Sequence, residues 1–393
     1  MAAAVGAVVP GVLASCSDEE SEYGVLDTPN EVLPYVGKHQ AGITAPRPPA
    51  GGLVALNVRS QNRKELNETI SELSKEIELL MSGEAYMKRK GGFPPLDTGI
   101  LGPTPGATTT SIVLSVGSSL FDKRFELENQ KPSELIEMPK FDNDYMVKPH
   151  RSHGDILLTI GAADHESVMH SLRQVLRRTR GELLPKWLKT GFNTIDFNAG
   201  PGQAPGRNLM GFKDGTSNPS QENKKLMEKI VWVQSGDDEP DWTEGGTYQA
   251  VRVIRMMTEF WDRTRLNEQE SLLGRHRDSG APVGMLKETE TPKFTSFDSH
   301  IARANPRTTG SEENLILRRG FNFSDGLDQN DQLDQGLLFI SYQRSLEKGF
   351  ITVQNRLNGE ALEEYIRPTG GGFYFALPGA KKSGEVLGSG LFT

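Results

Sequence analysis

The sequence contains a single cysteine, Cys16, in a chain of 393 residues. One thiol cannot form an internal disulfide, and it cannot build a zinc site or an iron–sulfur cluster that needs several cysteine ligands. The Cys-x-x-Cys-His segment that attaches some cofactors covalently is absent as well. Any cofactor of this chain is therefore expected to be held by noncovalent contacts.

An excess of positive charge and long apolar segments are also missing. The chain has 44 Lys and Arg against 52 Asp and Glu, and a net charge of −8 gives nucleic-acid binding no general electrostatic support. Apolar residues make up 36% and charged residues 24%, as in soluble globular proteins rather than disordered ones. After the N-terminus, no segment is long and apolar enough to span a membrane as a helix.

The N-terminus is similar to an export signal. Residues 2–14 are apolar but too few to cross a bilayer as a helix, and Leu13-Ala14-Ser15-Cys16 resembles the bacterial sequence in which the cysteine is lipidated. The basic residues that usually precede such a run are absent, so an apolar N-terminus with an incidental cysteine is the alternative. We expect residues 1–34 to be an export signal and tether. The protein is then exported to the periplasm or cell envelope, with a possible lipid anchor at Cys16.

Residues 35–200 show the order of elements of a ferredoxin-like unit. Apolar residues recur at helical spacing in 60–81, and Gly83 follows as a C-cap. Asp164 is expected to cap a second helix that ends near Arg180. Apolar runs predict strands at 52–58, 111–117, 156–161 and 192–197. The resulting order, β-α-β-β-α-β, is that of the ferredoxin-like fold.

A segment rich in Gly and Pro, 201–205, indicates a boundary to a second unit, 201–393. Apolar runs predict strands at 248–256, 337–342 and 373–377, and a short helix at 267–273. The irregular stretch 277–335 is typical of functional loops, since compact domains otherwise connect their elements by short ones. We therefore expect an α+β protein of two related halves with antiparallel sheets, the second carrying the site.

His300 has the most unusual surroundings of the seven histidines. It follows Asp298, precedes Arg303, and lies shortly before the helix-breaking pair Asn305-Pro306. An imidazole can bind a metal or move a proton, and arginine stabilises negative charge. His150 and His153 could also form a metal pair, but no third ligand is evident near them.

Asp214 and Arg318 are the other candidates for chemistry. Asp214 lies in Gly211-Phe212-Lys213-Asp214-Gly215-Thr216, where glycines let the backbone approach a ligand, although an Asx turn explains the same residues. Arg318 follows the apolar run 315–317, which places it on a strand or at its end. It could donate hydrogen bonds to a developing anion, or it could be a surface arginine.

Ordered motifs along the chain resemble those of the dye-decolorizing peroxidases, and among these the exported EfeB-type deferrochelatase/peroxidase subgroup. The resemblance extends from about residue 35 to the C-terminus, and a twin-arginine signal is the main feature that is missing. The matching segments are Gly37-Lys38-His39-Gln40-Ala41-Gly42-Ile43, Ser152-His153-Gly154-Asp155-Ile156, 211–219, Gly274-Arg275, 298–307, Ile316-Leu317-Arg318-Arg319-Gly320, 336–343 and Gly370-Gly371-Gly372-Phe373.

This resemblance implies two ferredoxin-like halves that form a barrel-like fold, with noncovalent haem b in the C-terminal half. His300 matches the proximal iron ligand, and Asp214 and Arg318 match the distal catalytic residues. A carboxylate near the C-terminal end should bind the proximal imidazole, with Glu364 as the first choice and Glu360 as the alternative. The remaining residues implied in haem binding are Gly215, Leu337, Phe339, Arg275 and Arg303, the two arginines as partners of the propionates.

The implied activity is oxidation of organic donors by hydrogen peroxide. The alternative is a deferrochelatase that releases iron from haem with the porphyrin intact, for iron uptake. The implied partners are peroxide, an organic donor, iron-uptake membrane proteins and a second copy in a homodimer. Large donors would need a surface aromatic relay, although at 7% aromatic content most aromatics should lie in the core. The candidates are Trp187, Trp232, Trp242, Trp261, Tyr248 and Tyr342.

Overall fold

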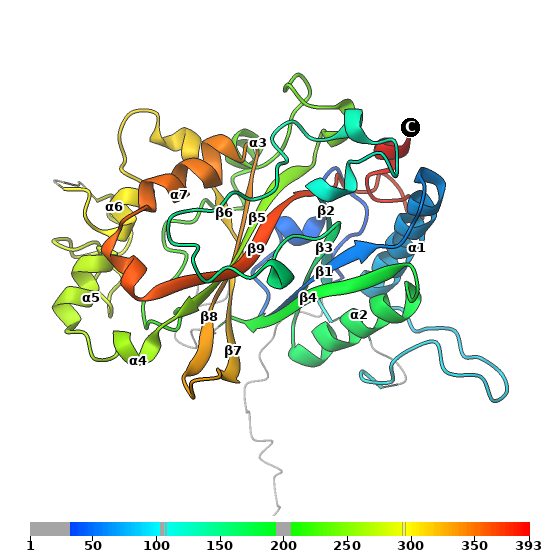
Figure 1. The fold of residues 1–393 in the computed structure, drawn as a ribbon, viewed down its shortest axis with the longest axis horizontal. Helices are drawn as coiled ribbons and strands as arrows, with labels where there is room; N and C mark the ends of the chain where they lie inside the picture. The colour runs from blue at the N-terminus through cyan, green and yellow to red at the C-terminus, as the bar shows by residue number, and fades with distance from the viewer. Residues whose placement is uncertain (1–31, 103–105, 107, 194–205, 293, 295) are drawn as a thin grey trace, which may run out of the picture.

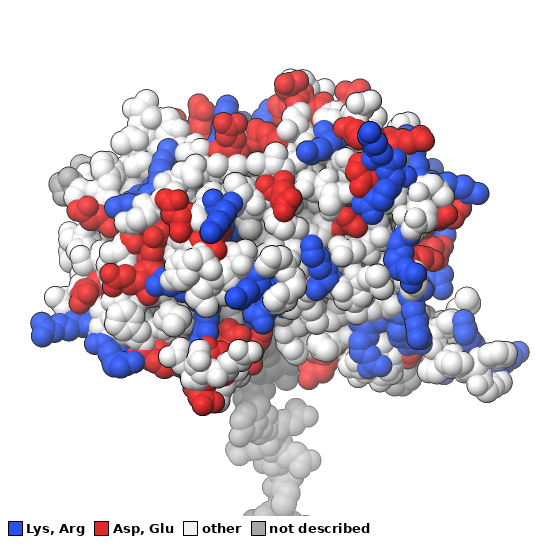
Figure 2. Space-filling model, in the orientation of Figure 1, with Lys and Arg blue, Asp and Glu red and all other residues white. Residues whose placement is uncertain are grey.

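A computed structural model of the chain describes residues 32–393 except 103–105, 107, 194–205, 293 and 295. The predicted export signal, with Cys16, and the predicted boundary at 201–205 lie outside the described residues. Acidic and basic side chains are interspersed on the face of the molecule shown in Figure 2.

The first half is a ferredoxin-like unit with the predicted order of elements. Its strands are paired antiparallel in the order β2-β3-β1-β4. Asn62 and Asp164 each cap a helix by accepting a hydrogen bond from a backbone N–H, and Gly83 ends α1 in the left-handed conformation. The elements are β1 (Ala50–Val58), α1 (Arg63–Ser82), β2 (Ser111–Gly117), β3 (Ile156–Ala162), α2 (His165–Arg178) and β4 (Leu183–Phe192).

The second half repeats this pattern with more irregular connections. Its strands are paired in the order β9-β5-β8-β7, which is the order of the first half in equivalent strands. Helix α3 (Lys224–Ile230) lies before the first strand of this half. Its elements are β5 (Thr247–Met256), α4 (Thr258–Trp261), α5 (Leu266–Leu273), α6 (His300–Ala304), β6 (Leu317–Arg318), β7 (Phe321–Leu327), β8 (Leu333–Gln343), α7 (Thr352–Leu357) and β9 (Ile366–Ala376).

The two units share one closed sheet. Strand β2 pairs with β9, β4 pairs with β7, and β5 pairs with β8 as well as with β9. Within the described residues the sheet therefore closes into a barrel, with β6 beside β8. Helices α1 and α2 lie at one side of the barrel, and α4 to α7 lie at the other (Figure 1).

Alternation along the strands separates two apolar cores. Val54 and Leu56 of β1 pack in the core that includes α1 and α2, whereas Leu53 and Ala55 belong to the core inside the barrel. The barrel interior also contains Trp187, Val251, Val253, Phe321, Leu338 and Tyr374. The outward faces of β5 and β8 are thereby left to line a site on the side of α4 to α7.

Two sequence-based expectations about strands were wrong. The fourth strand is β4, Leu183–Phe192, which begins nine residues before the strand predicted at 192–197; residues 194–197 of that prediction lie outside the described residues. Its pattern was hard to recognise because Pro185 lies within it and because a lysine, Lys189, occupies a buried position. Within 277–335, which was expected to be irregular, the structure has β7 and the short elements α6 and β6.

The barrel interior should not tolerate a methyl group on Gly51. A Cβ at this position would lie 2.2 Å from Cζ of Phe321, a buried ring. We expect Gly51→Ala to destabilise the protein by about 1–3 kcal/mol, through overpacking. Thermal unfolding measures the effect. Gly92→Ala, where nothing lies within 4 Å, is the control, and equal melting temperatures for the two variants would contradict the packing described here.

Candidate functional site

A cavity of about 290 Å³ lies against the outer face of the second unit. Arg252 and Ile254 of β5 and Leu337 and Phe339 of β8 form part of its wall, because alternate residues of each strand point out of the barrel. Residues of segments 208–217, 300–307 and 314–318 and of helix α7 form further parts of the wall. Its apolar lining includes Met256, Phe339, Phe350, Leu357 and Leu362, and a cavity of this size and composition is typical of small-molecule sites.

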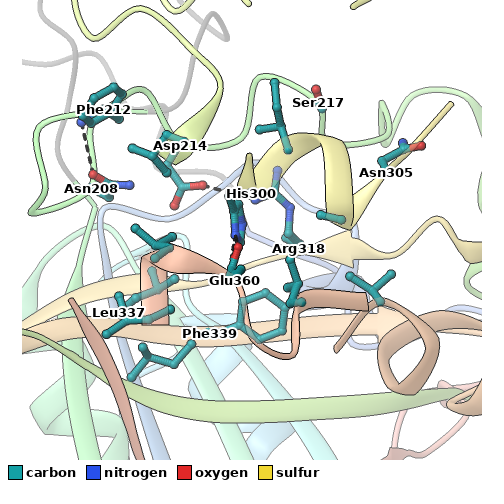
Figure 3. Close-up of a pocket in the computed structure, with 18 of the residues that line it drawn as sticks. Asn208, Phe212, Asp214, Ser217, His300, Asn305, Arg318, Leu337, Phe339 and Glu360 are labelled. Carbon is teal, nitrogen blue, oxygen red and sulfur yellow. Dashed lines mark hydrogen bonds and ion pairs between the residues drawn. The ribbon is translucent and has the colours of Figure 1, made fainter. Parts of the chain in front are cut away.

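His300 projects into this cavity from the first residue of α6. Its Nδ1–H donates to the Glu360 carboxylate, at 2.8 Å from Oε2 and 3.1 Å from Oε1. The Glu360 side chain is only 3% exposed. This hydrogen bond fixes the tautomer, so that Nε2 carries the free lone pair when the ring is neutral. The imidazole lies between Glu360 on one side and Asp214 on the other in Figure 3.

The first choice for the carboxylate beside His300 was wrong. Glu364 is exposed, whereas Glu360 is buried and bonded to the imidazole. Glu360 immediately precedes the 3₁₀ turn Ala361–Glu364, and the rotation of that turn carries Glu364 away to solvent.

The pKa of His300 is raised above its usual value of 6.5. Burial lowers this pKa, but the charge of Glu360 and its hydrogen bond outweigh burial. A raised pKa in the folded state means that the pair stabilises the cofactor-free protein at low pH. That contribution is lost as the pH rises through the pKa of folded His300.

Asp214 and Arg318 meet at the cavity. Nη1 of Arg318 donates to Oδ1 of Asp214 at 3.4 Å, and the two side chains are 34% and 20% exposed. Asn218 holds the backbone of Arg318 from both sides, since its amide accepts from Arg318 N at 2.8 Å and donates to Arg318 O at 3.0 Å. The strand position predicted for Arg318 is confirmed, because it lies in β6.

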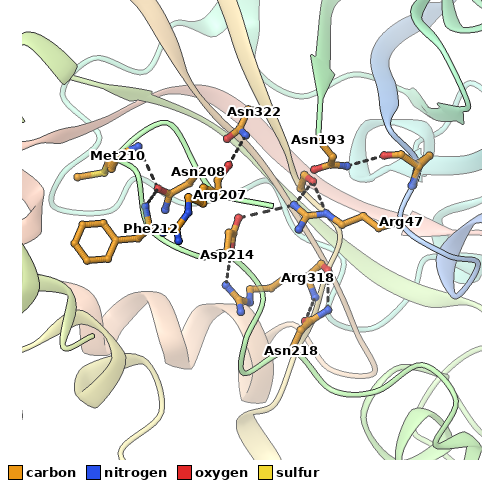
Figure 4. A network of polar contacts seen from close by, with 12 residues as sticks. Arg47, Asn193, Arg207, Asn208, Met210, Phe212, Asp214, Asn218, Arg318 and Asn322 are labelled. Carbon is orange, nitrogen blue, oxygen red and sulfur yellow. Dashed lines mark hydrogen bonds and ion pairs between the residues drawn. The ribbon is translucent and has the colours of Figure 1, made fainter. Parts of the chain in front are cut away.

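The turn before Asp214 is held by Asn208. Its side-chain oxygen accepts from the backbone N–H of Met210 and of Phe212, each at 3.1 Å. Gly211 and Gly215 both have positive φ, 86° and 102°, which favours glycine at these places. The turn therefore presents Asp214 to the cavity through defined hydrogen bonds (Figure 4).

Arg47 is a residue of this network that the sequence analysis missed. Its Nη2 lies 3.8 Å from Oδ2 of Asp214, on the side of the carboxylate that Arg318 does not contact (Figure 4). It comes from the loop that precedes β1, in the first unit. Proline residues flank it in Pro46-Arg47-Pro48, and this pattern carries no recognisable functional signal, because the contact depends on how the two units join.

Of the two arginines predicted to face propionates, only Arg275 lines the cavity. Its side chain is buried, and it donates to Gly280 O and to the Ser217 hydroxyl. The prediction for Arg303 was wrong in position, because its guanidinium donates to Phe297 O and Asn358 O and is not part of the lining. Arg307 lines the cavity instead, and the backbone of Arg307 itself has a positive φ of 58°. Gly215, Leu337 and Phe339 also line the cavity, and their contact with haem stays a prediction.

The other histidines lie outside this cavity, and the six aromatics lie in the core. His300 is the only histidine of the described residues in the lining of this cavity, and those residues contain no cluster of three or more His, Cys, Asp or Glu side chains suited to a metal ion. The expectation that most of the aromatics lie in the core is confirmed, since none of the six is more than 9% exposed. In the described part of the chain, no helix has the length and apolar character needed to cross a membrane.

Two family models match most of the chain. A model described as "Dyp-type peroxidase, N-terminal" matches residues 40–193, and one described as "Dyp-type peroxidase, C-terminal" matches residues 205–381. The gap between the two matches falls in the region of the predicted domain boundary.

Curated and structural relatives agree with these models. The chain is 45% identical to proteins named deferrochelatase from Escherichia coli (strain K12) and Shigella sonnei (strain Ss046), covering 96% of this chain and 92% of each relative. Ferric DtpA from Streptomyces lividans has a TM-score of 0.82 at 31% identity, covering 92% of this chain and 97% of that one. A DyP-type peroxidase from Cellulomonas bogoriensis has the same TM-score at 27% identity, covering 92% of this chain and 98% of that one.

The bond between His300 and Glu360 predicts a distinctive titration in the cofactor-free protein. NMR should give His300 a pKa above 6.5, and Glu360→Gln should lower it, because the nearest negative charge that opposes burial is then gone. Glu364→Gln is the matched control and should leave the titration of His300 unchanged. Equal effects of the two substitutions, or none from Glu360→Gln, would show that the assigned partner is incorrect.

Proposed function

Since this chain belongs to the Dyp-type peroxidase family, we propose that its cavity binds haem b without a covalent bond and uses hydrogen peroxide to oxidise organic donors. The observation that carries the proposal is that two pairs of residues line one cavity. His300 is oriented by Glu360, and Asp214 is paired with Arg318 (Figure 3). A haem peroxidase site needs these parts, a ligand for the iron and an acid/base pair for peroxide.

The residues present fit a haem group. Nε2 of His300 faces the cavity with its lone pair free, because Nδ1–H is bonded to Glu360. The apolar lining suits a flat macrocycle, and Arg275 and Arg307 near Ser217 supply cations for its two carboxylates. When bound, haem supplies the iron centre that reduces peroxide by two electrons and recovers those electrons singly from donors.

The residues on either side of the haem have separate roles. On the proximal side, the Glu360 carboxylate accepts the Nδ1–H hydrogen bond, which gives the imidazole partial anionic character and makes it a stronger iron ligand. On the distal side, the Asp214 carboxylate can take a proton from one peroxide oxygen and return it to the departing one. Arg318 would donate to the negative charge that develops as the oxygen–oxygen bond breaks.

A second candidate function uses the same cavity. The curated relatives are named deferrochelatase, and that name favours removal of iron from haem with the porphyrin left intact. Chromatography of the products separates the two functions. Protoporphyrin IX released from supplied haem would support dechelation, whereas oxidised donor with intact haem would support the peroxidase alone.

The cellular setting follows from the N-terminal pattern and from this second function. We propose export to the periplasm or cell envelope with a lipid on Cys16, a homodimeric assembly, and contact with iron-uptake membrane proteins if dechelation operates. The apolar run at 2–14 and the sequence around Cys16 support the first part. Cell fractionation of the native protein and of Cys16→Ser tests it, and an unaltered distribution of the variant would contradict the anchor.

Loss of the iron ligand should empty the site. We expect His300→Ala to retain at most trace haem after purification, since no other histidine of the described residues lines the cavity. Haem content is measured from the Soret absorbance relative to protein. The control is His165→Ala, at an exposed position of α2, which should load haem normally. Full haem in His300→Ala with unchanged activity would contradict the assignment.

Removal of the distal groups should slow the reaction with peroxide while haem stays bound. Arg318→Leu is expected to lower the second-order rate constant by roughly 10²–10³, the usual effect of losing a donor to a developing anion. Asp214→Asn should lower it by about 10²–10⁴, because the amide cannot carry the proton. Stopped-flow absorption at the Soret band gives both constants. Unchanged constants in both variants would place the peroxide site elsewhere.

A further inference from the structure

We propose that Arg47, from the loop of the first unit, is a positioning residue that keeps Asp214 and Arg318 apart enough for both to act on peroxide. This inference rests on the proposed function of the cavity. It concerns a residue that contacts neither His300 nor the apolar wall, and that acts through the carboxylate of Asp214.

The geometry shows one carboxylate shared by two guanidinium groups. Oδ1 of Asp214 accepts from Nη1 of Arg318 at 3.4 Å, and Oδ2 lies 3.8 Å from Nη2 of Arg47. Both distances exceed the 2.7–2.9 Å or so of a close charge-assisted hydrogen bond. The carboxylate is therefore held between two cations by charge, without being locked onto either of them.

Arg47 is itself fixed by contacts that do not involve Asp214. Its Nε and Nη2 both donate to the carbonyl of Gly320, at 3.2 and 2.6 Å, and its side chain is 25% exposed. Burial lowers the pKa of Arg47, and the charge of Asp214 partly opposes this effect. Because the pKa of arginine normally lies far above neutral, Arg47 remains positively charged.

The loop that carries Arg47 is held by hydrogen bonds from residues of both units. Nδ2 of Asn193 donates to Pro48 O at 2.7 Å, and Nη2 of Arg319 donates to Pro46 O at 3.3 Å. Arg319 and Gly320 directly follow Arg318 in the chain. Arg47 thus ties the first unit to the segment that presents Arg318, and its guanidinium is aimed at Asp214 by backbone contacts (Figure 4).

This arrangement has a consequence for the reaction. If Arg318 were the only cation near Asp214, the two side chains could close into a tight pair, which would neutralise the cation and occupy the proton acceptor. Arg47 attracts the other carboxylate oxygen and opposes that closure. Arg318 then keeps donors for the developing charge, and Asp214 keeps a free lone pair for the proton.

The test is a double-mutant cycle on the holoenzyme, read out as kcat/KM for hydrogen peroxide. We expect Arg47→Gln to lower this constant about tenfold, with haem content and the KM for the organic donor unchanged. Arg47→Lys, which keeps the charge, should recover most of the loss. In the Asp214→Asn background, Arg47→Gln should change the constant by less than about twofold, because the residue it acts on is gone. Arg180→Gln, at an exposed position, is the control and should match its parent protein in each background.

Each outcome separates this inference from the function on which it rests. Equal losses from Arg47→Gln with and without Asp214, or a loss accompanied by lower haem content, would overturn the inference and assign Arg47 a structural role. An unchanged constant in Arg47→Gln would overturn it as well. If Asp214→Asn alone had no effect, the proposed role of Asp214 would fail first, and the inference would fail with it.

Discussion

The hydrogen bond between His300 and buried Glu360 is the interaction on which the chemistry of this cavity depends. It decides which imidazole nitrogen faces the cavity, and it places a negative charge behind the ring. Without it, burial alone would lower the pKa of His300 and leave its tautomer undetermined. For the proposed haem site, the carboxylate would thereby supply an iron ligand that is both oriented and electron-rich.

The fold places the residues of the site by joining two units that have the same order of strands. Pairing of β2 with β9 and of β4 with β7 closes the barrel, and the outward faces of β5 and β8 become one wall of the cavity. The same closure brings the loop around Arg47 onto the segment that follows Arg318. The site thus lies in the second unit, but its electrostatics include a charge from the first.

Local patterns predicted much of this structure, and the errors lie where the direction of a turn or a partner distant in the sequence decides. Strand β2 was predicted at its observed bounds, and Asp164 caps α2 as expected, because both depend on neighbouring residues alone. Choosing Glu360 over Glu364 requires the direction of a 3₁₀ turn, and choosing Arg307 over Arg303 requires the backbone turn after α6. Strand β4 escaped recognition because its buried Lys189 is stabilised by Asp325, a residue of β7.

The most direct test of the central claim is an absorption spectrum of the haem-loaded protein before and after one equivalent of hydrogen peroxide, followed by an organic donor. The proposed site predicts a Soret band that changes within the mixing time of the experiment and returns to its starting form as the donor is oxidised. A protein that takes up no haem, or whose Soret band is unaffected by peroxide, would contradict the assignment of this cavity as a peroxidase site.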